Sequence, residues 1–336
     1  MFKRSLIVLE PDSQPDAVIQ RGVAMARACL SEVVFYTGLT HTSQPAADLP
    51  DREMATHWDS LDDKRVRTER LHRQAQQVAE DLGVLSRSVI ATADDPANGI
   101  LGAASTSHCD VIVVACDGGN AVVRLLNGSV IPGLVTASPV PVMVCTTRPS
   151  AEVAHGTATS RVLVILEDSD LNGVARTQGL DLARELAADL LFVHITPPDV
   201  LPVVDAAGFV GGSNDRLAAE MRMQSRRLLA SASASATRAG LTARGMSLPA
   251  GTSAKDIARM AVDQACELIV VAHRGSNAVM RLLTGSLIPG LITAAATPVL
   301  ICREPEHPPK RRTPRRRHHR HRAAAAAAAA RAAHGH

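Results

Sequence analysis

The sequence repeats itself at a constant offset of 157 residues. The stretch "ACDGGNAVVRLLNGSVIPG" at 115–133 returns as "AHRGSNAVMRLLTGSLIPG" at 272–290, and no insertion or deletion separates the two copies. Other matched positions are Arg4 with Arg161, Gly22 with Gly179, Gly83 with Gly240, and Pro141 with Pro298. A repeat of this length predicts two tandem copies of one domain, each long enough to bury a core of its own.

The repeat also divides the chain into segments. We expect a first domain at 1–147, a linker at 148–160, a second domain at 161–304 and a tail at 305–336. The linker is built mainly from small and polar residues, as exposed connections are. The tail consists largely of Arg, His, Pro and Ala without apolar periodicity, which predicts disorder.

Charge is distributed unevenly between the two copies and the tail. The whole chain carries +3 and the part from Arg303 onward carries +8, which leaves −5 for the residues before it. The two copies therefore give no electrostatic indication of a nucleic-acid surface. One Trp, one Tyr and four Phe in the whole chain also leave few aromatic platforms on which single-stranded nucleic acid could stack.

The sequence has neither a recognisable membrane span nor a secretory signal. Its apolar runs fall short of the roughly 18 residues of a spanning helix, and "MFKRSLIVLE" has too short an apolar run for a signal. We therefore expect a cytoplasmic protein with no membrane contact. The six cysteines form no CxxC pair, so we expect buried thiols that act as small hydrophobes rather than a metal site or disulfides.

Within each copy, short apolar runs alternate with amphipathic stretches. The runs at 5–10 and 162–167 are continuous and rich in Leu and β-branched residues, which is typical of strands covered on both faces. A long helix that ends at Gly83 is predicted by apolar residues at helical spacing, namely Leu71, Ala75, Val78 and Leu82. The regular alternation predicts an α/β fold with a doubly wound parallel sheet in each copy. Ligands of such sheets bind beyond the carboxyl ends of the strands, where the strand order reverses.

A glycine-rich loop follows the fourth expected strand of each copy. In the second copy Gly275 makes a tight turn, and Gly285 and Ser286 then open a helix whose first N–H groups the serine can cap. A helix N-terminus beside a glycine turn offers several backbone donors to one anion, which suits a phosphate group. A turn and a cap that bind nothing fit the same residues equally well. The chain has no GK[ST] sequence, so this is not a Walker A loop.

The spacing A-x2-G-x9-G-S, followed by a helix and the strand "PVLIC", resembles the G-x2-G-x9-G-[S/T] nucleotide signature of the universal stress protein family. The resemblance covers both copies and excludes the tail. It implies a Rossmann-like parallel sheet of strand order 3-2-1-4-5 in each copy. It also implies that the last strands, 141–145 and 298–302, pair antiparallel within the chain. Some members of that family bind ATP and others bind none.

The resemblance implies the site residues as well. Phosphate contacts fall on Gly275, Gly285 and Ser286 in the second copy and on Gly118, Gly128 and Ser129 in the first. Ala272 and Ala115 take the place of the family's first loop glycine. An acid at the end of the first strand, Glu167 or Glu10, approaches the ribose and phosphates, and the backbone near Ile195 or Gly38 reads adenine.

The two copies differ at the centre of this loop. Cys116 and Asp117 precede the first glycine in one copy, whereas His273 and Arg274 precede it in the other. A unit charge about 6 Å from a triphosphate is worth roughly 3 kcal/mol at an effective dielectric near 20. Ile195, which stands where the first copy has Gly38, also gives adenine a larger apolar surface to contact. We therefore expect the second copy to be the better nucleotide site and the first to be weak or empty.

The resemblance implies a tandem universal stress protein, a cytoplasmic regulatory module in stress response that binds ATP, with Mg²⁺ as a candidate companion ion. Two alternatives stay open: an interaction scaffold of the same fold that binds no nucleotide, and a weak ATP-hydrolysing enzyme. No GxSxG or HExxH motif and no acid–base pair at the loop is recognisable, so no catalytic residue is assigned. His273 is the best candidate for a general base, but a hydrogen-bond donor to phosphate is the simpler interpretation.

The tail leads to the first prediction. Nine Lys and Arg side chains between Lys310 and Arg331 are expected to bind polyanions by releasing counterions, and this contact weakens as salt rises. Deletion of the residues after Glu306 should therefore reduce retention on a nucleic-acid column at low salt. The measurement compares the deletion with the full-length chain over a salt gradient, and equal retention of the two would show that the tail has no such role.

Overall fold

The computed structural model describes residues 2–11, 15–39, 51–116, 130–146, 160–166, 173–196, 215–274 and 287–304. Within these ranges the side chains at 51–62, 215–217, 273–274 and 304 are not described. The tail at 305–336 and the linker up to residue 159 lie outside the described residues. No helix in the described part of the chain is long and apolar enough to cross a membrane.

Strands and helices alternate through both copies. The first copy contains β1 (Arg4–Val8), α1 (Asp16–Ala28), β2 (Glu32–Leu39), α2 (Asp51–Asp81), β3 (Ser86–Thr92), α3 (Pro96–Thr106), β4 (Val111–Cys116), α5 (Val130–Ala137) and β5 (Val142–Thr146). The second contains β6 (Arg161–Leu166), α6 (Val174–Glu185), β7 (Asp189–Ile195), α7 (Asp215–Arg238), β8 (Ala243–Leu248), α8 (Ala254–Asp263), β9 (Cys266–Arg274), α10 (Leu287–Ala294) and β10 (Val299–Glu304).

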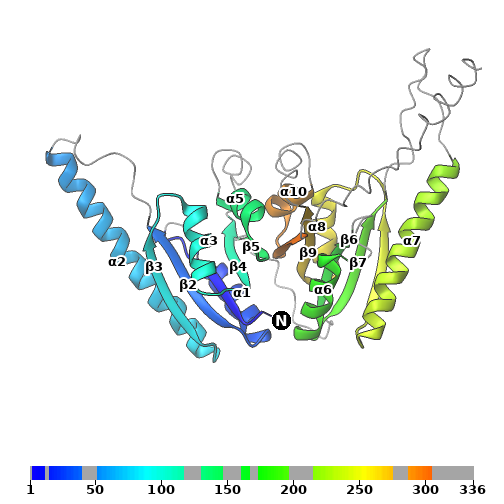
Figure 1. Ribbon diagram of the computed structural model, residues 1–336, viewed down its shortest axis with the longest axis horizontal. Coiled ribbons are helices and arrows are strands. Elements are labelled where there is room, and N and C mark those ends of the chain that lie inside the picture. The colour runs from blue at the N-terminus through cyan, green and yellow to red at the C-terminus, as the bar shows by residue number, and fades with distance from the viewer. Residues whose placement is uncertain are drawn as a thin grey trace, which may run out of the picture. The chain divides into compact units, whose positions relative to one another are not determined.

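The strands form one ten-stranded sheet of order β3-β2-β1-β4-β5-β10-β9-β6-β7-β8 (Figure 1). Strands within each copy are parallel, so each copy has the expected order 3-2-1-4-5, and the two orders mirror each other across the middle of the sheet. β5 and β10 pair antiparallel, with Val144 opposite Val299 and Met143 opposite Leu300. The predicted pairing of 141–145 with 298–302 is therefore confirmed.

Helices cover the sheet on both faces because its strands are apolar on both. Along β2, Val33 and Phe35 pack into one apolar cluster and Val34 and Tyr36 into the other, as strand alternation requires. We call the side covered by α1, α2, α6 and α7 the first face. The side covered by α3, α5, α8 and α10 is the second face.

The long helix α2 follows the predicted apolar stripe. Leu71 and Ala75 are buried on the first face, and Val78 and Leu82 pack against the same cluster. Gly83 then adopts a φ of +71°, the left-handed conformation in which glycine commonly ends a helix. The equivalent Gly240 after α7 has a φ of +74°. The two long helices therefore end at equivalent positions, Asp81 and Arg238, just before these glycines.

One arginine ties the two copies together beside the β5–β10 pair. Arg21 on α1 donates from Nη1 to the carbonyl oxygen of Thr146 at 3.0 Å and to that of Ala296, in the other copy, at 3.2 Å. Gln178 stands at the equivalent position on α6, and its buried Oε1 has no hydrogen-bond partner among the described residues. The junction is thus built from equivalent elements with unequal polar contacts.

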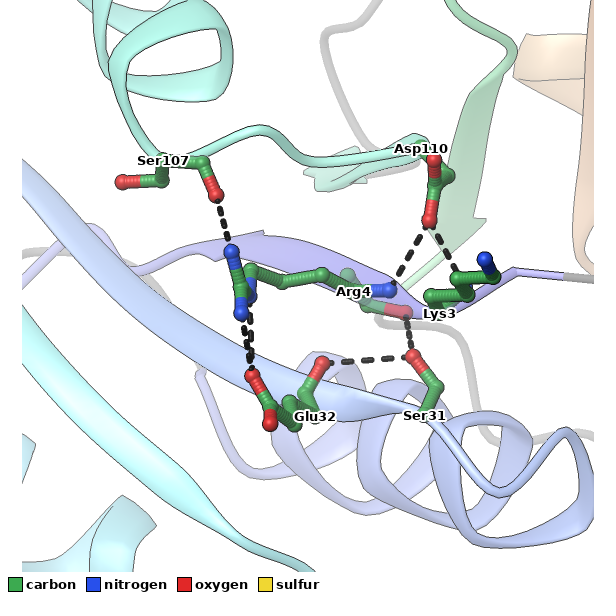
Figure 2. Close-up of polar contacts among 7 residues, drawn as sticks. Lys3, Arg4, Ser31, Glu32, Ser107 and Asp110 are labelled. Atoms are coloured by element: carbon green, nitrogen blue, oxygen red, sulfur yellow. Dashed lines mark hydrogen bonds and ion pairs between the residues drawn. The ribbon is translucent and has the colours of Figure 1, made fainter.

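The amino-terminal edge of the first copy is held by a second arginine (Figure 2). Arg4 donates from Nη1 to the carbonyl oxygen of Ser107 at 2.8 Å and from Nη2 to Glu32 Oε2 at 2.6 Å. Asp110 Oδ2 accepts the backbone N–H groups of Lys3 and Arg4 at 2.7 and 3.0 Å. These contacts join β1, β2 and the segment between α3 and β4 at one end of the sheet.

The second copy repeats the central part of this arrangement. Arg161, the repeat partner of Arg4, donates from Nη1 to the carbonyl oxygen of Gln264 at 2.8 Å. Gln264 directly follows α8, as Ser107 directly follows α3. In both copies a guanidinium therefore satisfies a carbonyl group at the end of a helix, where the helix dipole favours positive charge.

Two glycines of the first-face helices allow these helices to pack closely on the sheet, which gives a stability prediction. A Cβ added at Gly22 would lie 2.6 Å from Ile7 Cδ1, and one at Gly179 would overlap Val164. Gly22→Ala and Gly179→Ala should each lower the free energy of unfolding by about 1–3 kcal/mol through overpacking. Denaturant unfolding of each variant measures the change.

Gly102 in α3 provides the matched control, because an added Cβ there has no neighbour within 4 Å. Gly102→Ala should raise the free energy of unfolding by about 0.5–1 kcal/mol, since alanine is the better helix former. If Gly22→Ala and Gly179→Ala behaved like Gly102→Ala, the close helix–sheet approach would be wrong.

Candidate functional site

The strand order reverses beside β1 and β6, so the carboxyl ends of these strands and their neighbours define the candidate site of each copy. In the first copy, Glu10 is exposed just beyond β1, and Gly38 and Ala115 are half-buried near the ends of β2 and β4. In the second copy, Ile195 and Ala272 are half-buried near the ends of β7 and β9. The structure thus brings these sequence-predicted residues to the expected edge of the sheet.

Seven of the predicted site residues lie outside the described residues, and their roles stay predictions. These are Glu167, Gly275, Gly285 and Ser286 in the second copy and Gly118, Gly128 and Ser129 in the first. The elements on either side of these residues are described.

The glycine loop of the second copy begins later than the sequence suggested. The sequence predicted a strand that ends at Ala272 and a tight turn between Ala272 and Gly275, but β9 continues through His273 and Arg274. Their backbones pair with Arg303 and Glu304, because β10 extends equally far and supplies hydrogen-bond partners. In the first copy the described pairing of β4 with β5 ends at Cys116 and Thr146. Cys116 and Thr146 are also the last described residues of these two strands.

Each loop leads directly into a helix. α5 begins at Val130 and α10 at Leu287, one residue after Ser129 and Ser286, as the sequence predicts. Neither helix has an acidic residue in its first turn. The positive end of each helix dipole is therefore not offset by a carboxylate within the helix, which favours an anion there.

The other helices of the second face are capped by their own acids. Asp95 accepts the backbone N–H groups of Ala97 at 2.8 Å and Asn98 at 3.3 Å at the start of α3. Ser253 and Asp256 form a reciprocal capping box at the start of α8. A carboxylate already occupies each of these helix starts, so a phosphate group would be repelled there. Among the described helices of this face, the acid-free starts of α5 and α10 are left for an anion.

A buried polar network supports the edge from the first face. Thr37 donates from Oγ1 to the carbonyl oxygen of Leu9 at 2.8 Å, and the same oxygen lies 2.8 Å from His72 Nε2 on α2. Because the hydroxyl proton goes to Leu9, His72 must donate from Nε2, and its Nδ1 carries the lone pair. That Nδ1 is buried without a partner among the described residues. The network joins the end of β1, next to Glu10, to β2 and α2.

In the second copy a histidine and a hydroxyl group also join the second strand to the long helix, but the histidine now stands on the strand and the hydroxyl group on the helix. His194 on β7 occupies the position of Thr37, and its Nδ1 hydrogen-bonds the hydroxyl of Ser225 on α7. Leu229 occupies the position of His72. A buried histidine–hydroxyl pair therefore links the second strand to the long helix in both copies, with the histidine on the helix in one and on the strand in the other. Sequence reasoning missed both pairs, although a histidine inside the apolar run "DLLFVHI" marks one of them.

The cysteines contribute to packing. All six are buried, and none forms a disulfide bond with another described cysteine. Burial raises the pKa of Cys145 to about 12 and that of Cys29 to about 11, so these thiols stay protonated and unreactive near neutral pH. This agrees with the prediction that they act as small hydrophobes. Within the described ranges, no group of three or more His, Cys, Asp or Glu residues could hold a metal ion.

A duplicated, doubly wound α/β sheet with strand order 3-2-1-4-5 in each copy defines the class of fold, and sequence comparison then gives the family. The profile of the Universal stress protein family matches residues 1–146 and 159–303. The chain therefore belongs to the universal stress protein family, in a tandem form with two matching regions.

Individual relatives agree with this assignment. Universal stress protein YxiE of Bacillus subtilis (strain 168) is 26% identical over 147 residues, which cover 43% of this chain and 99% of YxiE. The crystal structure of a universal stress protein from Archaeoglobus fulgidus DSM 4304 has a TM-score of 0.61 at 17% identity and covers 90% of this chain and 96% of that one. That of a putative universal stress protein from Pseudomonas aeruginosa UCBPP-PA14 has a TM-score of 0.55 at 16% identity and covers 90% and 94%. Both structural matches show the same fold.

The buried histidine of the first copy predicts a dependence of stability on pH. Burial lowers the pKa of His72 to about 4, from an ordinary value of 6.5. As pH falls, the unfolded chain therefore binds a proton at His72 before the folded chain does. The contribution of His72 to the free energy of unfolding is full above pH 6.5 and is lost between pH 6.5 and 4. The loss should reach about 3 kcal/mol.

The test compares unfolding free energies of the wild type and His72→Leu, which carries the residue of the second copy, at several pH values. The wild type should lose about 3 kcal/mol more than His72→Leu as pH falls to 4. His108→Asn is the control, because His108 is exposed and its φ of 53° suits asparagine. Equal pH slopes in the wild type and His72→Leu would show that His72 is not buried in neutral form.

Proposed function

We propose that this tandem universal stress protein is a cytoplasmic regulatory module that binds an adenine nucleotide, with ATP held mainly by the second copy. The observation that carries the proposal is the loop motif itself. In both copies the G-x9-G-S loop leads straight into a helix with no acid in its first turn, beside the reversal of strand order. That combination provides backbone donors and a positive dipole for phosphate groups.

The proposed site divides between domains at 1–147 and 161–304, joined by a linker at 148–160. In the second domain Gly275, Gly285 and Ser286 would hold the phosphates, Glu167 would approach the ribose, and the backbone at Ile195 would meet adenine. Glu10, Gly118, Gly128 and Ser129 are the counterparts in the first domain. Mg²⁺, where it accompanies ATP, usually binds phosphate oxygens and one or two carboxylates, so it requires no separate cluster of ligands.

The second copy is favoured on charge. Arg274 precedes its loop glycine, whereas Asp117 stands at the equivalent position of the first copy. A basic group near the phosphates stabilises bound ATP and an acidic group opposes it, and the difference exceeds tenfold in affinity even after solvent screening. The output of such a module is a change in the conformation of the loops or in their partners.

Two charge-inserting variants test this function. Gly285→Glu places bulk and negative charge at the start of α10, and Gly128→Glu does the same at the start of α5. ATP titration of the full-length chain by calorimetry should show at least a tenfold loss of affinity in Gly285→Glu and little change in Gly128→Glu. The opposite pattern would assign the nucleotide to the first copy.

Each variant serves as the control for the other, because both carry the same substitution at equivalent positions. The wild type should also co-purify with an adenine nucleotide. A wild type that binds no ATP would favour an interaction scaffold instead. Release of ADP with turnover, measured by chromatography of the bound nucleotide, would favour slow hydrolysis.

A further inference from the structure

The long helices α2 and α7 each expose a large apolar side chain at the same position of the repeat. Val66 on α2 is 63% exposed and Met223 on α7 is 49% exposed. Single exposed apolar residues are common on proteins and need no explanation. The other large apolar side chains that are exposed among the described residues have small or polar counterparts in the other copy: Leu30 has Ala187, Leu85 has Thr242, Ile90 has Ser247 and Val262 has Ser105. The repetition at 66 and 223 therefore singles out the outer surface of the long helices.

Arginines surround this apolar position in both helices. Between 63–81 and 220–238 the two copies have identical residues at five positions, and three of these are buried in the core. The two identical positions on the exposed side are both arginines, Arg65 with Arg222 and Arg70 with Arg227. The outer surface of each helix thus has an apolar residue with an arginine one residue before it and another four residues after it.

One exposed position of this surface differs in charge between the helices. Three residues after the apolar side chain, α2 has Glu69 and α7 has Arg226. Three residues before it, both helices have an acid, Asp63 in α2 and Glu220 in α7. Residues three or four apart are neighbours on a helix surface. The surface of α7 is therefore acidic on the amino-terminal side of Met223 and basic on the carboxyl-terminal side, whereas α2 has an acid on both sides of Val66.

The charges of α7 are complementary to themselves when two copies of the helix run antiparallel. With a two-fold axis at Met223, Glu220 of one helix lies opposite Arg226 of the other and one position from Arg227, and each contact is made twice. The two methionine side chains meet at the axis and cover each other from water. In the same arrangement of two α2 helices, Asp63 would lie opposite Glu69 and the like charges would repel.

We propose that the exposed surface of α7 around Met223 docks a second copy of this chain, with the two α7 helices antiparallel, to form a symmetric dimer. α7 covers β7 and β8 at one end of the ten-stranded sheet (Figure 1). Its inner side, which includes Leu228 and Ala232, is buried against the sheet, so the surface around Met223 faces outward. Two-fold dimers are the commonest oligomers of soluble proteins. The dimer does not depend on the proposed nucleotide site.

Sedimentation equilibrium of the full-length chain at several concentrations tests the dimer. A single pair of helices makes a small interface, so the dimer should be weak, and it should weaken further as salt screens the exposed charges. Arg226→Glu, which carries the residue of α2, places carboxylates opposite each other at both ends of the contact and should raise the dimer Kd at least tenfold. Arg70→Glu makes the same charge change on α2 and should leave this Kd unchanged.

Two complementary variants separate a lost contact from a damaged fold. Glu220→Arg makes the surface of α7 wholly basic, and Arg226→Glu/Arg227→Glu makes it wholly acidic. Each variant alone should stay monomeric, because like charges then meet across the axis. An equimolar mixture should dimerise at least as strongly as the wild type. Circular dichroism of each variant checks that the helices are intact.

A cross-link tests the position of the axis directly. A residue on a two-fold axis meets its own counterpart, so Met223→Cys should form a disulfide between two molecules when oxidised glutathione is added. The six native cysteines are buried and do not compete. Val66→Cys is the matched control, since it exposes a thiol at the equivalent position of α2, and it should cross-link at least tenfold more slowly.

Four results would each overturn the inference. The first is a wild type that stays monomeric at every concentration, and the second is a dimer whose Kd is the same in Arg226→Glu. The third is a mixture of folded Glu220→Arg and Arg226→Glu/Arg227→Glu that does not dimerise. The last is equal cross-linking of Met223→Cys and Val66→Cys.

Discussion

The pairing of β5 with β10 is the contact on which the rest of the architecture depends. A doubly wound sheet standing alone would expose the edge of its fifth strand, and here Val144 and Val299 are both 0% exposed because each strand covers the other. The two apolar clusters both contain residues of the two copies, so the copies share one core on each face of the sheet. Arg21 then adds a hydrogen bond to the carbonyl oxygen of Ala296 beside the paired strands.

The internal repeat makes the chain its own comparison, and the two ends of the sheet have diverged to different extents. At the amino-terminal edge, Arg4 and Arg161 make the same contact with the carbonyl group that follows a helix. At the carboxyl edge the copies differ in the loop residues and in the placement of the buried histidine. The bond from a guanidinium to a helix-end carbonyl is kept in both copies, whereas residue types change at the edge at which ligands of such sheets bind and at Arg21, which Gln178 replaces.

Sequence reasoning reached the fold because its signals are local or repeated. The apolar runs, the stripe that contains Leu71 and the stop at Gly83 each act within one element, and the repeat then doubles the evidence for every strand. The polar ties between Thr37 and His72 and between His194 and Ser225 could not be predicted in this way. Their partners are 35 and 31 residues apart and meet only after a strand and a helix have packed. The extension of β9 through Arg274 was missed for the same reason, since it depends on the length of β10.

Covalent fusion of the copies explains how such asymmetry can persist. In a symmetric homodimer every substitution appears in both subunits, so the two sites stay identical. Association of two separate molecules also loses translational and rotational entropy. Within one chain the second copy is always present to cover β5, whatever happens at the carboxyl edge of the first. The buried histidine can therefore stand on the helix in one copy, as His72, and on the strand in the other, as His194, while the shared core holds both edges in place. The tandem form keeps the stability of a paired sheet and frees each site to change independently.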